Sequence, residues 1–200
     1  MTRFATAVYR VPALTPLVLL LLYVPGWYWS QWWQFDRQAL GATAPEWWRW
    51  WGAHLAHGTV EHAVSNALAI VVAALVAPRW MNRLPGLLLA AFLMAGVSLG
   101  IWLNNPDIDV YRGFSGVGHG WLMLAFAWSP WFSPWTRIAV VVGIMLKVVW
   151  EESDLFMIAQ WSGYFADAPV LTDAHWYGVL LAVPGVILAY LAQFIRERMN

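Results

Sequence analysis

The chain has 200 residues, of which 61% are hydrophobic and only 11% are charged, and its formal net charge is zero. Soluble domains carry about a quarter charged residues, so this composition indicates a protein whose apolar surface faces lipid. The neutral balance argues against a nucleic-acid partner, and the lack of cysteine excludes disulfides and thiolate metal sites. The length fits one domain, which we place over residues 1–200.

Six apolar runs predict an all-α, polytopic membrane protein with six transmembrane helices. A helix needs about 20 apolar residues to cross the hydrocarbon. In chain order the predicted spans are Val11–Trp29, Val60–Ala77, Leu84–Leu103, Ser115–Trp128, Trp135–Trp150 and Ala174–Ile195. No small-residue cleavage site follows the first run, so we expect it to be a retained span and not a removed signal peptide.

The charges between these runs predict their orientation. If the six spans alternate, seven arginines fall on one side of the membrane, namely Arg3, Arg10, Arg79, Arg83, Arg137, Arg196 and Arg198. Cytoplasmic loops carry an excess of basic residues, so both termini are expected inside. The segment Gln31–Gly58 then faces outside, and its many tryptophans predict that it lies in the membrane interface.

A serine and a histidine stand within the fourth and sixth runs. Ser115 lies in Gly113-Phe114-Ser115-Gly116, and His175 opens Ala174-His175-Trp176-Tyr177-Gly178. Polar groups in such segments are costly and usually functional, and a serine becomes a nucleophile when a neighbouring base takes its proton. Ser115 as nucleophile and His175 as base would make an enzyme. The alternative is that Ser115 forms a hydrogen bond to its own helix and that His175 is a packing residue whose hydrogen bonds are satisfied.

Small residues predict that these two helices pack closely. Gly116 and Gly120 lie four residues apart on one helix face, and Gly178 and Ala182 repeat the spacing. Faces of small residues let membrane helices approach each other closely. We therefore expect the fourth and sixth spans to bring Ser115 and His175 together.

The start of the second span offers donors for a developing oxyanion. His62 and Asn66 lie on one face, and the backbone N–H of Ser115 could add a third donor. The alternative is that these groups cap the helix or bind lipid headgroups. A metal site of His54, His57 and His62 is disfavoured because their spacing does not match the His-Glu-x-x-His pattern. We expect neither a metal nor another cofactor.

Taken in order, the motifs resemble those of the rhomboid family of intramembrane serine proteases, across nearly the whole chain. Trp48-Arg49 is similar to the Trp-Arg motif of the first loop, and His57, His62 and Asn66 have the spacing of the second helix. The run Gly113–Gly116 resembles the GxSG motif, and Ala174–Gly178 resembles AHxxG.

The resemblance implies a role for each of these residues. Ser115 would be the nucleophile and His175 the base, and His62 and Asn66 would help Ser115 form the oxyanion hole. The remaining motif residues would support the site or bind substrate, namely Arg49, His57, Gly116 and Gly178. The fifth span and the loop after it would gate substrate entry.

One position departs from most rhomboids and resembles the rhombosortase branch. An aromatic residue commonly follows the serine by four positions, and here that residue is His119. Lys147 and Glu151, four residues apart in the fifth span, are also unusual. This branch implies cleavage of a C-terminal Gly-Gly-type sorting tail on exported, membrane-tethered proteins, at the periplasmic face of the inner membrane of Gram-negative bacteria. The expected partners are such transmembrane substrates and membrane lipids.

The roles of these three residues stay open in the sequence. His119 could compete with His175 as base, or stack on it or bond to it and fix its tautomer. We favour the second, because a side chain on the serine's own helix points along the axis. Lys147 and Glu151 could form a structural ion pair or bind substrate. Alternatives for the whole chain are a general rhomboid protease of other single-span substrates and an inactive helix-binding protein.

Overall fold

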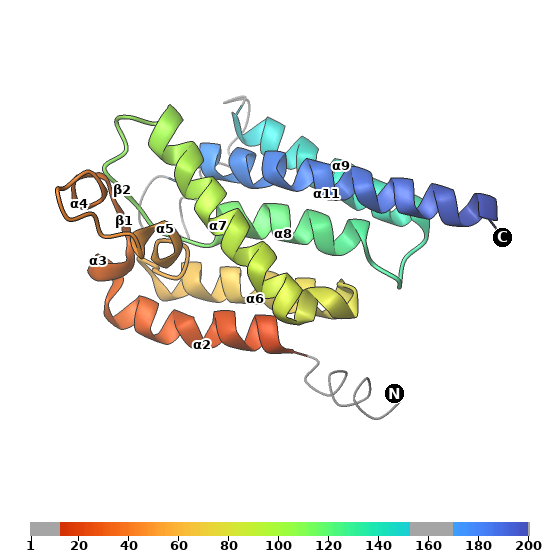
Figure 1. Cartoon of the computed structure of the whole chain (residues 1–200), viewed down its shortest axis with the longest axis horizontal. Helices are drawn as coiled ribbons and strands as arrows, with labels where there is room; N and C mark the ends of the chain where they lie inside the picture. The colour runs from red at the N-terminus through yellow and green to blue at the C-terminus, as the bar shows by residue number, and fades with distance from the viewer. Residues whose placement is uncertain (1–12, 153–169, 200) are drawn as a thin grey trace.

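The structure is a computed structural model that describes residues 13–152 and 170–199. Within those ranges the chain is mainly helical (Figure 1). The longer helices are α2 (Leu14–Tyr28), α6 (Val60–Val76), α7 (Leu84–Asn104), α8 (Ser115–Ala127), α9 (Pro134–Glu152) and α11 (Thr172–Met199). The shorter elements are α3 (Ser30–Trp33), β1 (Phe35–Asp36), α4 (Arg37–Leu40), α5 (Arg49–Gly52), η1 (Arg79–Asn82) and β2 (Val110–Tyr111).

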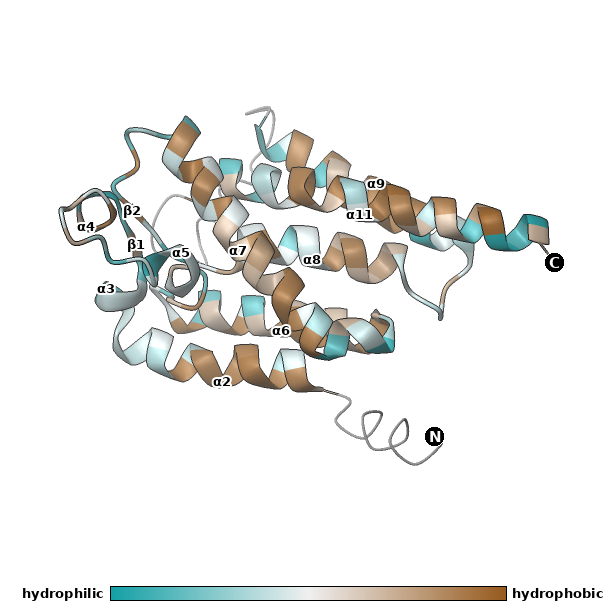
Figure 2. Cartoon of the chain, in the orientation of Figure 1, coloured by the Kyte–Doolittle hydropathy of each residue, from teal (hydrophilic) through white to brown (hydrophobic). Residues whose placement is uncertain are grey.

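The prediction of an all-α chain is confirmed, and each of the six apolar runs forms one of the longer helices. Two of them, α7 and α11, are long and apolar enough to cross a membrane, whereas α2 and α6 are apolar but shorter. Figure 2 shows hydrophobic residues along the helices and hydrophilic ones toward their ends and in the loops. Arg3, Arg10, Val11 and most of the loop before α11 lie outside the described residues.

The short helix α8 forms the centre of the fold and packs against α6, α7, α9 and α11 (Figure 1). Nine of its 13 residues are buried, which fits a helix enclosed by others. The α6, α8 and α11 helices run in the same direction (Figure 1). Their N-terminal ends therefore place His62, Ser115 and His175 at one end of the molecule. Arginines lie near the opposite ends, with Arg79 just after α6 and Arg196 in the last turn of α11.

The segment between α2 and α6 folds over the end that carries Ser115. Its strand β1 pairs antiparallel with β2, with Phe35 opposite Tyr111, and so joins this segment to the chain that leads into α8. The Arg37 guanidinium donates to the carbonyls of Ile101, Trp102, Asn105 and Ile108. A cation at these carbonyls satisfies groups that the C-terminal end of α7 leaves unpaired.

Candidate active site

A sharp turn at Gly113 sets the position of Ser115. Gly113 has φ +125°, a conformation that side chains rarely allow. Its N–H donates to the Ala53 carbonyl at 2.9 Å, and its own carbonyl accepts from the Tyr111 hydroxyl at 2.9 Å. A Cβ at this position would lie 2.5 Å from Cε1 of His62. Only glycine therefore fits, and the turn fixes the serine at the first position of α8.

Close contact between α8 and α11 brings the serine and the histidine together, as the glycine spacing predicted. A Cβ on Gly116 would lie 2.6 Å from the Ala174 carbonyl oxygen, and one on Gly178 would overlap the Gly116 carbonyl. The backbones are in direct contact at the residues next to Ser115 and His175. Their separation thus depends on the absence of side chains at both glycines.

Ser115 and His175 form a hydrogen bond, with Oγ of the serine 3.0 Å from Nε2 of the histidine. The other ring nitrogen, Nδ1, lies 2.9 Å from Oε2 of Glu151. An ionised carboxylate only accepts hydrogen bonds, so Nδ1 carries the hydrogen and Nε2 is left to accept from the hydroxyl. This is the arrangement that a general base requires.

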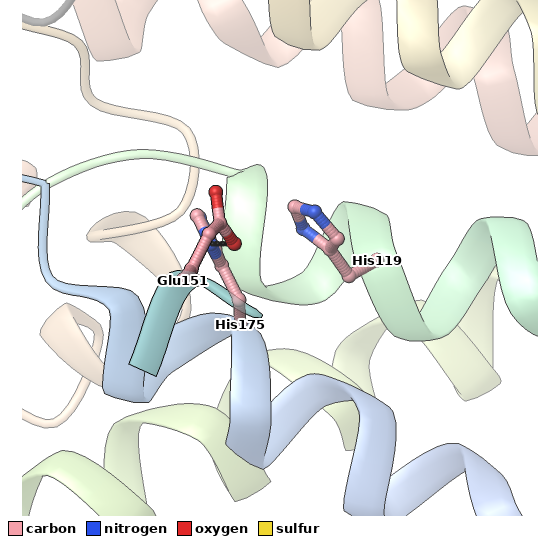
Figure 3. A group of neighbouring side chains, drawn as sticks. All are labelled: His119, Glu151 and His175. Carbon is pink, nitrogen blue, oxygen red and sulfur yellow. Dashed lines mark hydrogen bonds and ion pairs between the residues drawn. The ribbon is translucent and has the colours of Figure 1, made fainter. Parts of the chain in front are cut away.

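Glu151 and Lys147 reach this pair from α9. The Lys147 ammonium lies 2.7 Å from Oε1 of Glu151. The glutamate side chain is 1% exposed, whereas the lysine side chain is 41% exposed. The two residues do form the ion pair considered from their spacing, but the glutamate also contacts His175. Figure 3 shows Glu151 beside His175, joined by a dashed line, with His119 on the neighbouring α8.

His119 stacks on His175, with ring centroids 4.2 Å apart and planes inclined by 30°. Its Nδ1 lies 2.7 Å from the Ser115 carbonyl, and its Nε2 lies 2.6 Å from Nζ of Lys147. Since the ammonium only donates and the carbonyl only accepts, His119 is a neutral ring with its hydrogen on Nδ1. Both nitrogens are thus engaged away from the serine hydroxyl. Its stacking matches the arrangement that we favoured, although Glu151, and not His119, bonds to His175.

His57, His62 and Asn66 lie together beside the serine turn. The Asn66 amide donates to Nε2 of His57 at 3.1 Å, and Nδ1 of His57 donates to the Leu55 carbonyl at 3.1 Å. The rings of His57 and His62 meet edge to face with centroids 5.1 Å apart. His62 in turn lies against Gly113. His57 therefore orients the Asn66 side chain, while His62 borders the turn.

His54 and His57 belong to the loop before α6, and both are buried. Burial lowers the pKa of His54 to about 4, although the carbonyls of Met94 and Gly113 oppose part of this change. Burial, and secondarily the neighbouring His62, lowers the pKa of His57 to about 3. Both rings are therefore neutral at physiological pH. His54 lies 2.8 Å from the Met94 carbonyl and 3.3 Å from that of Gly113, and so helps hold the turn.

Arg49 braces the segment between α2 and α6. Its side chain forms an ion pair with Glu46 at 2.6 Å and donates to the carbonyls of Gln31 and Gln34. These bonds fix the fold of the segment. Arg49 contributes to the site through this segment, which holds the Gly113 turn in place.

His119, Glu151 and His175 each offer one ligand atom, and these atoms lie within 4.8 Å of one another. The donor set does not fit a metal ion. Nitrogen lone pairs lie in the plane of the imidazole ring, so two stacked rings cannot both point at an ion between them. The Lys147 ammonium also bonds both His119 and Glu151, and a metal cation there would be repelled by it. These side chains are therefore arranged for hydrogen bonds and an ion pair, and not for binding a metal ion.

Comparison with known proteins identifies the family of the chain. A protein-family model described as the Rhomboid domain matches residues 44–195. The chain belongs to the rhomboid family. No individual curated protein matches the chain. Rhomboids are intramembrane serine proteases that act on transmembrane substrates, and the matched region includes Ser115, His175 and the cluster around them.

Two sets of contacts in the site were not predicted from the sequence. The bond between Glu151 and His175 joins α9 to α11 across 24 residues, and the i,i+4 spacing of Lys147 and Glu151 suggested a self-contained pair. Tyr111 and His54 converge on the Gly113 carbonyl, although nothing in their spacing indicates it. Charged residues that interrupt or directly follow the apolar run of α9, as Lys147 and Glu151 do, are the signal that could have indicated the first contact.

Proposed function

We propose that this rhomboid is an intramembrane serine endopeptidase that cuts C-terminal sorting tails from exported proteins, as rhombosortases do. The single observation that carries the proposal is the 3.0 Å bond between Ser115 Oγ and His175 Nε2. In this geometry the imidazole can take the hydroxyl proton as the oxygen attacks. Ser115 and His175 are both retained, which argues against an inactive helix-binding protein.

The reaction would run in two halves. Ser115 Oγ attacks the scissile carbonyl carbon while its proton moves to Nε2 of His175. The C–N bond then breaks, the proton passes to the leaving amine, and an ester to Ser115 remains. Water attacks that ester with His175 again acting as base, which releases the new carboxyl end and restores the serine.

The oxyanion would be held by donors at the start of α8 and α6. The first N–H groups of a helix have no partner within it, so the Ser115 N–H is available at the first turn of α8. The Asn66 amide is the second donor, held by His57, and the His62 ring is the third. Donors positioned in advance stabilise the charge that develops on the carbonyl oxygen.

We place six spans across the membrane, formed by α2, α6, α7, α8, α9 and α11, with the arginine-bearing ends in the cytoplasm. Ser115 and His175 would then open toward the periplasm of a Gram-negative inner membrane. A substrate helix would enter between α6 and α9. α9 carries Lys147 and Glu151 into the site, and its packing is against α8 and α11.

The Gly-Gly tail is proposed on two grounds. His119, stacked on His175, is a feature by which the chain resembles the rhombosortase branch. Glycine also loses the most conformational entropy in a helix, so a substrate span that begins with glycines unwinds most easily. An unwound backbone is required before Ser115 can reach a scissile carbonyl.

The test is cleavage of a single-span reporter that ends in a Gly-Gly motif, an apolar helix and an Arg-rich tail. Wild-type protein should release the soluble part with a new C-terminus at or next to the glycines. Ser115→Ala and His175→Ala should abolish release. A reporter with the glycines replaced by leucine should be cut at least tenfold more slowly. Equal cutting of both reporters would indicate a general rhomboid protease, and cutting by both variants would overturn the assignment.

A further inference from the structure

Four hydrogen bonds and one ion pair join five residues into a closed ring of contacts around Ser115. From the serine hydroxyl, hydrogen bonds run to His175 and on to Glu151, the ion pair joins Glu151 to Lys147, and hydrogen bonds run from Lys147 to His119 and back to the Ser115 carbonyl. Each of these contacts is between 2.6 and 3.0 Å long. The ring joins α8, α9 and α11. Within it, Glu151 is the only acid.

Glu151 is more deeply buried, and has more partners, than an i,i+4 ion pair requires. An exposed lysine could satisfy a glutamate at the helix surface, where such a pair adds only about 0.2–0.5 kcal/mol. Here the carboxylate is instead 1% exposed and divides its two oxygens between different partners. Oε1 contacts the ammonium, while Oε2 lies 2.9 Å from Nδ1 of His175. A buried carboxylate is costly unless both oxygens are paired, and the second partner is the imidazole.

We propose that Glu151 is a positioning residue that completes a Ser115–His175–Glu151 triad in this rhomboid. The proposal rests on the proposed function of the Ser115 site. Glu151 keeps the hydrogen of His175 on Nδ1, so that Nε2 faces the serine. When Nε2 takes the serine proton, the carboxylate stays ionised and stabilises the imidazolium, and the proton then goes to the leaving amine.

Lys147 and His119 hold the acid in place. The ammonium fixes Oε1, which leaves Oε2 directed at Nδ1. His119 accepts from the same ammonium and stacks against His175, which limits rotation of the catalytic ring. Because Lys147 offsets part of the carboxylate charge, Glu151 should contribute less than the acid of a soluble serine-protease triad, whose loss costs about 10⁴-fold in kcat.

The experiment compares Glu151→Gln with Glu152→Gln in full-length protein. Glu152 is the next residue on α9 and is exposed, so Glu152→Gln makes the same chemical change at a residue that forms none of the five contacts. The probe is a fluorophosphonate, whose labelling rate reports Ser115 reactivity without a natural substrate, and the Gly-Gly reporter separates kcat from KM. Glu151→Gln should label about 10²- to 10³-fold more slowly, with KM and thermal unfolding little changed. Glu152→Gln should stay within about twofold.

Two further readouts distinguish positioning from a structural role. The acidic limb of the pH–rate profile should move to lower pH in Glu151→Gln, because the imidazolium then lacks an adjacent carboxylate. Lys147→Met should cost less than about tenfold, since the glutamate can still bond His175. A merely structural ion pair would leave the limb in place and give equal losses in Lys147→Met and Glu151→Gln.

The outcomes separate this proposal from the proposed function. If Ser115→Ala is inactive but Glu151→Gln labels within about threefold of wild type, Glu151 is not a positioning residue and the protease assignment stands. If neither variant changes labelling, the protease assignment itself fails. Should Glu151→Gln not fold, Glu151→Asp keeps the charge one methylene short. It should label at least tenfold more slowly at an unchanged melting temperature, and wild-type labelling would overturn the proposal.

Discussion

Adding one methyl group at Gly116 should separate the serine from its base. A Cβ at this position would lie 2.6 Å from the Ala174 carbonyl oxygen, whereas carbon and carbonyl oxygen normally approach to about 3.3 Å. In Gly116→Ala, α8 and α11 must therefore move apart by about 0.7 Å. Gly116 follows Ser115, and Ala174 precedes His175, so the 3.0 Å bond would lengthen to about 3.7 Å, beyond hydrogen-bond range.

Gly116→Ala should lower both the reactivity of Ser115 and the stability of the protein. Misplacing catalytic groups by about 1 Å lowers rates by about 10²-fold, so fluorophosphonate labelling of Gly116→Ala should fall about 10- to 100-fold. Overpacking should also lower the free energy of unfolding by about 1–3 kcal/mol.

Two glycines provide matched controls. Gly118 is on the same helix, and a Cβ there would lie 3.5 Å from the Phe114 ring, which is an ordinary contact. Gly143, on α9, would meet nothing within 4 Å. Gly118→Ala and Gly143→Ala should both label at close to the wild-type rate. Labelling of Gly116→Ala at that same rate would refute the inferred dependence of the dyad on this helix contact.

Three other predictions follow from the site. Gly113→Ala should lose most activity and about 1–3 kcal/mol of stability, because φ is +125° and the methyl group would meet His62; thermal unfolding and labelling measure both effects. The pKa of His54 is lowered to about 4, so the unfolded chain, with a histidine pKa near 6.5, binds more protons between these values. The contribution of neutral His54 to the free energy of unfolding should therefore have its full value above about pH 6.5. It should fall by up to about 3 kcal/mol toward pH 4. When unfolding in detergent is measured across this pH range, the free energy of unfolding of His54→Gln should depend less on pH than that of the wild type. An equal dependence on pH in the two proteins would contradict the lowered pKa of His54. Chelators should leave labelling and cleavage intact, since Lys147 bonds both His119 and Glu151; activity restored only by added metal would contradict this.

The order of the helices and the serine–histidine contact could be predicted from the sequence because they depend on local signals. Apolar runs bounded by proline or arginine mark helices, and the spacing of Gly116, Gly120 and Gly178 predicted which two pack together. That contact then brings Ser115 to His175, since each lies one residue from the contacting backbone. Local patterns were sufficient wherever one pair of helices decided the geometry.

The partners of Glu151, Arg37 and Arg49 could not be predicted in the same way. Glu151 bonds a residue on another helix, Arg37 bonds carbonyls more than 60 residues away in the chain, and Arg49 bonds carbonyls of a preceding turn. Charged side chains of this kind have many local partners available in the sequence. Which one they take depends on how several helices and loops pack at once.

The most direct test of the account is to identify the residue that reacts with a fluorophosphonate in the purified, full-length protein. Peptide mass spectrometry should place the adduct on Ser115, at close to one per chain, and His175→Ala should label at least 10²-fold more slowly. An adduct on another residue, or labelling that persists in Ser115→Ala, would contradict the claim that Ser115 and His175 form the catalytic centre.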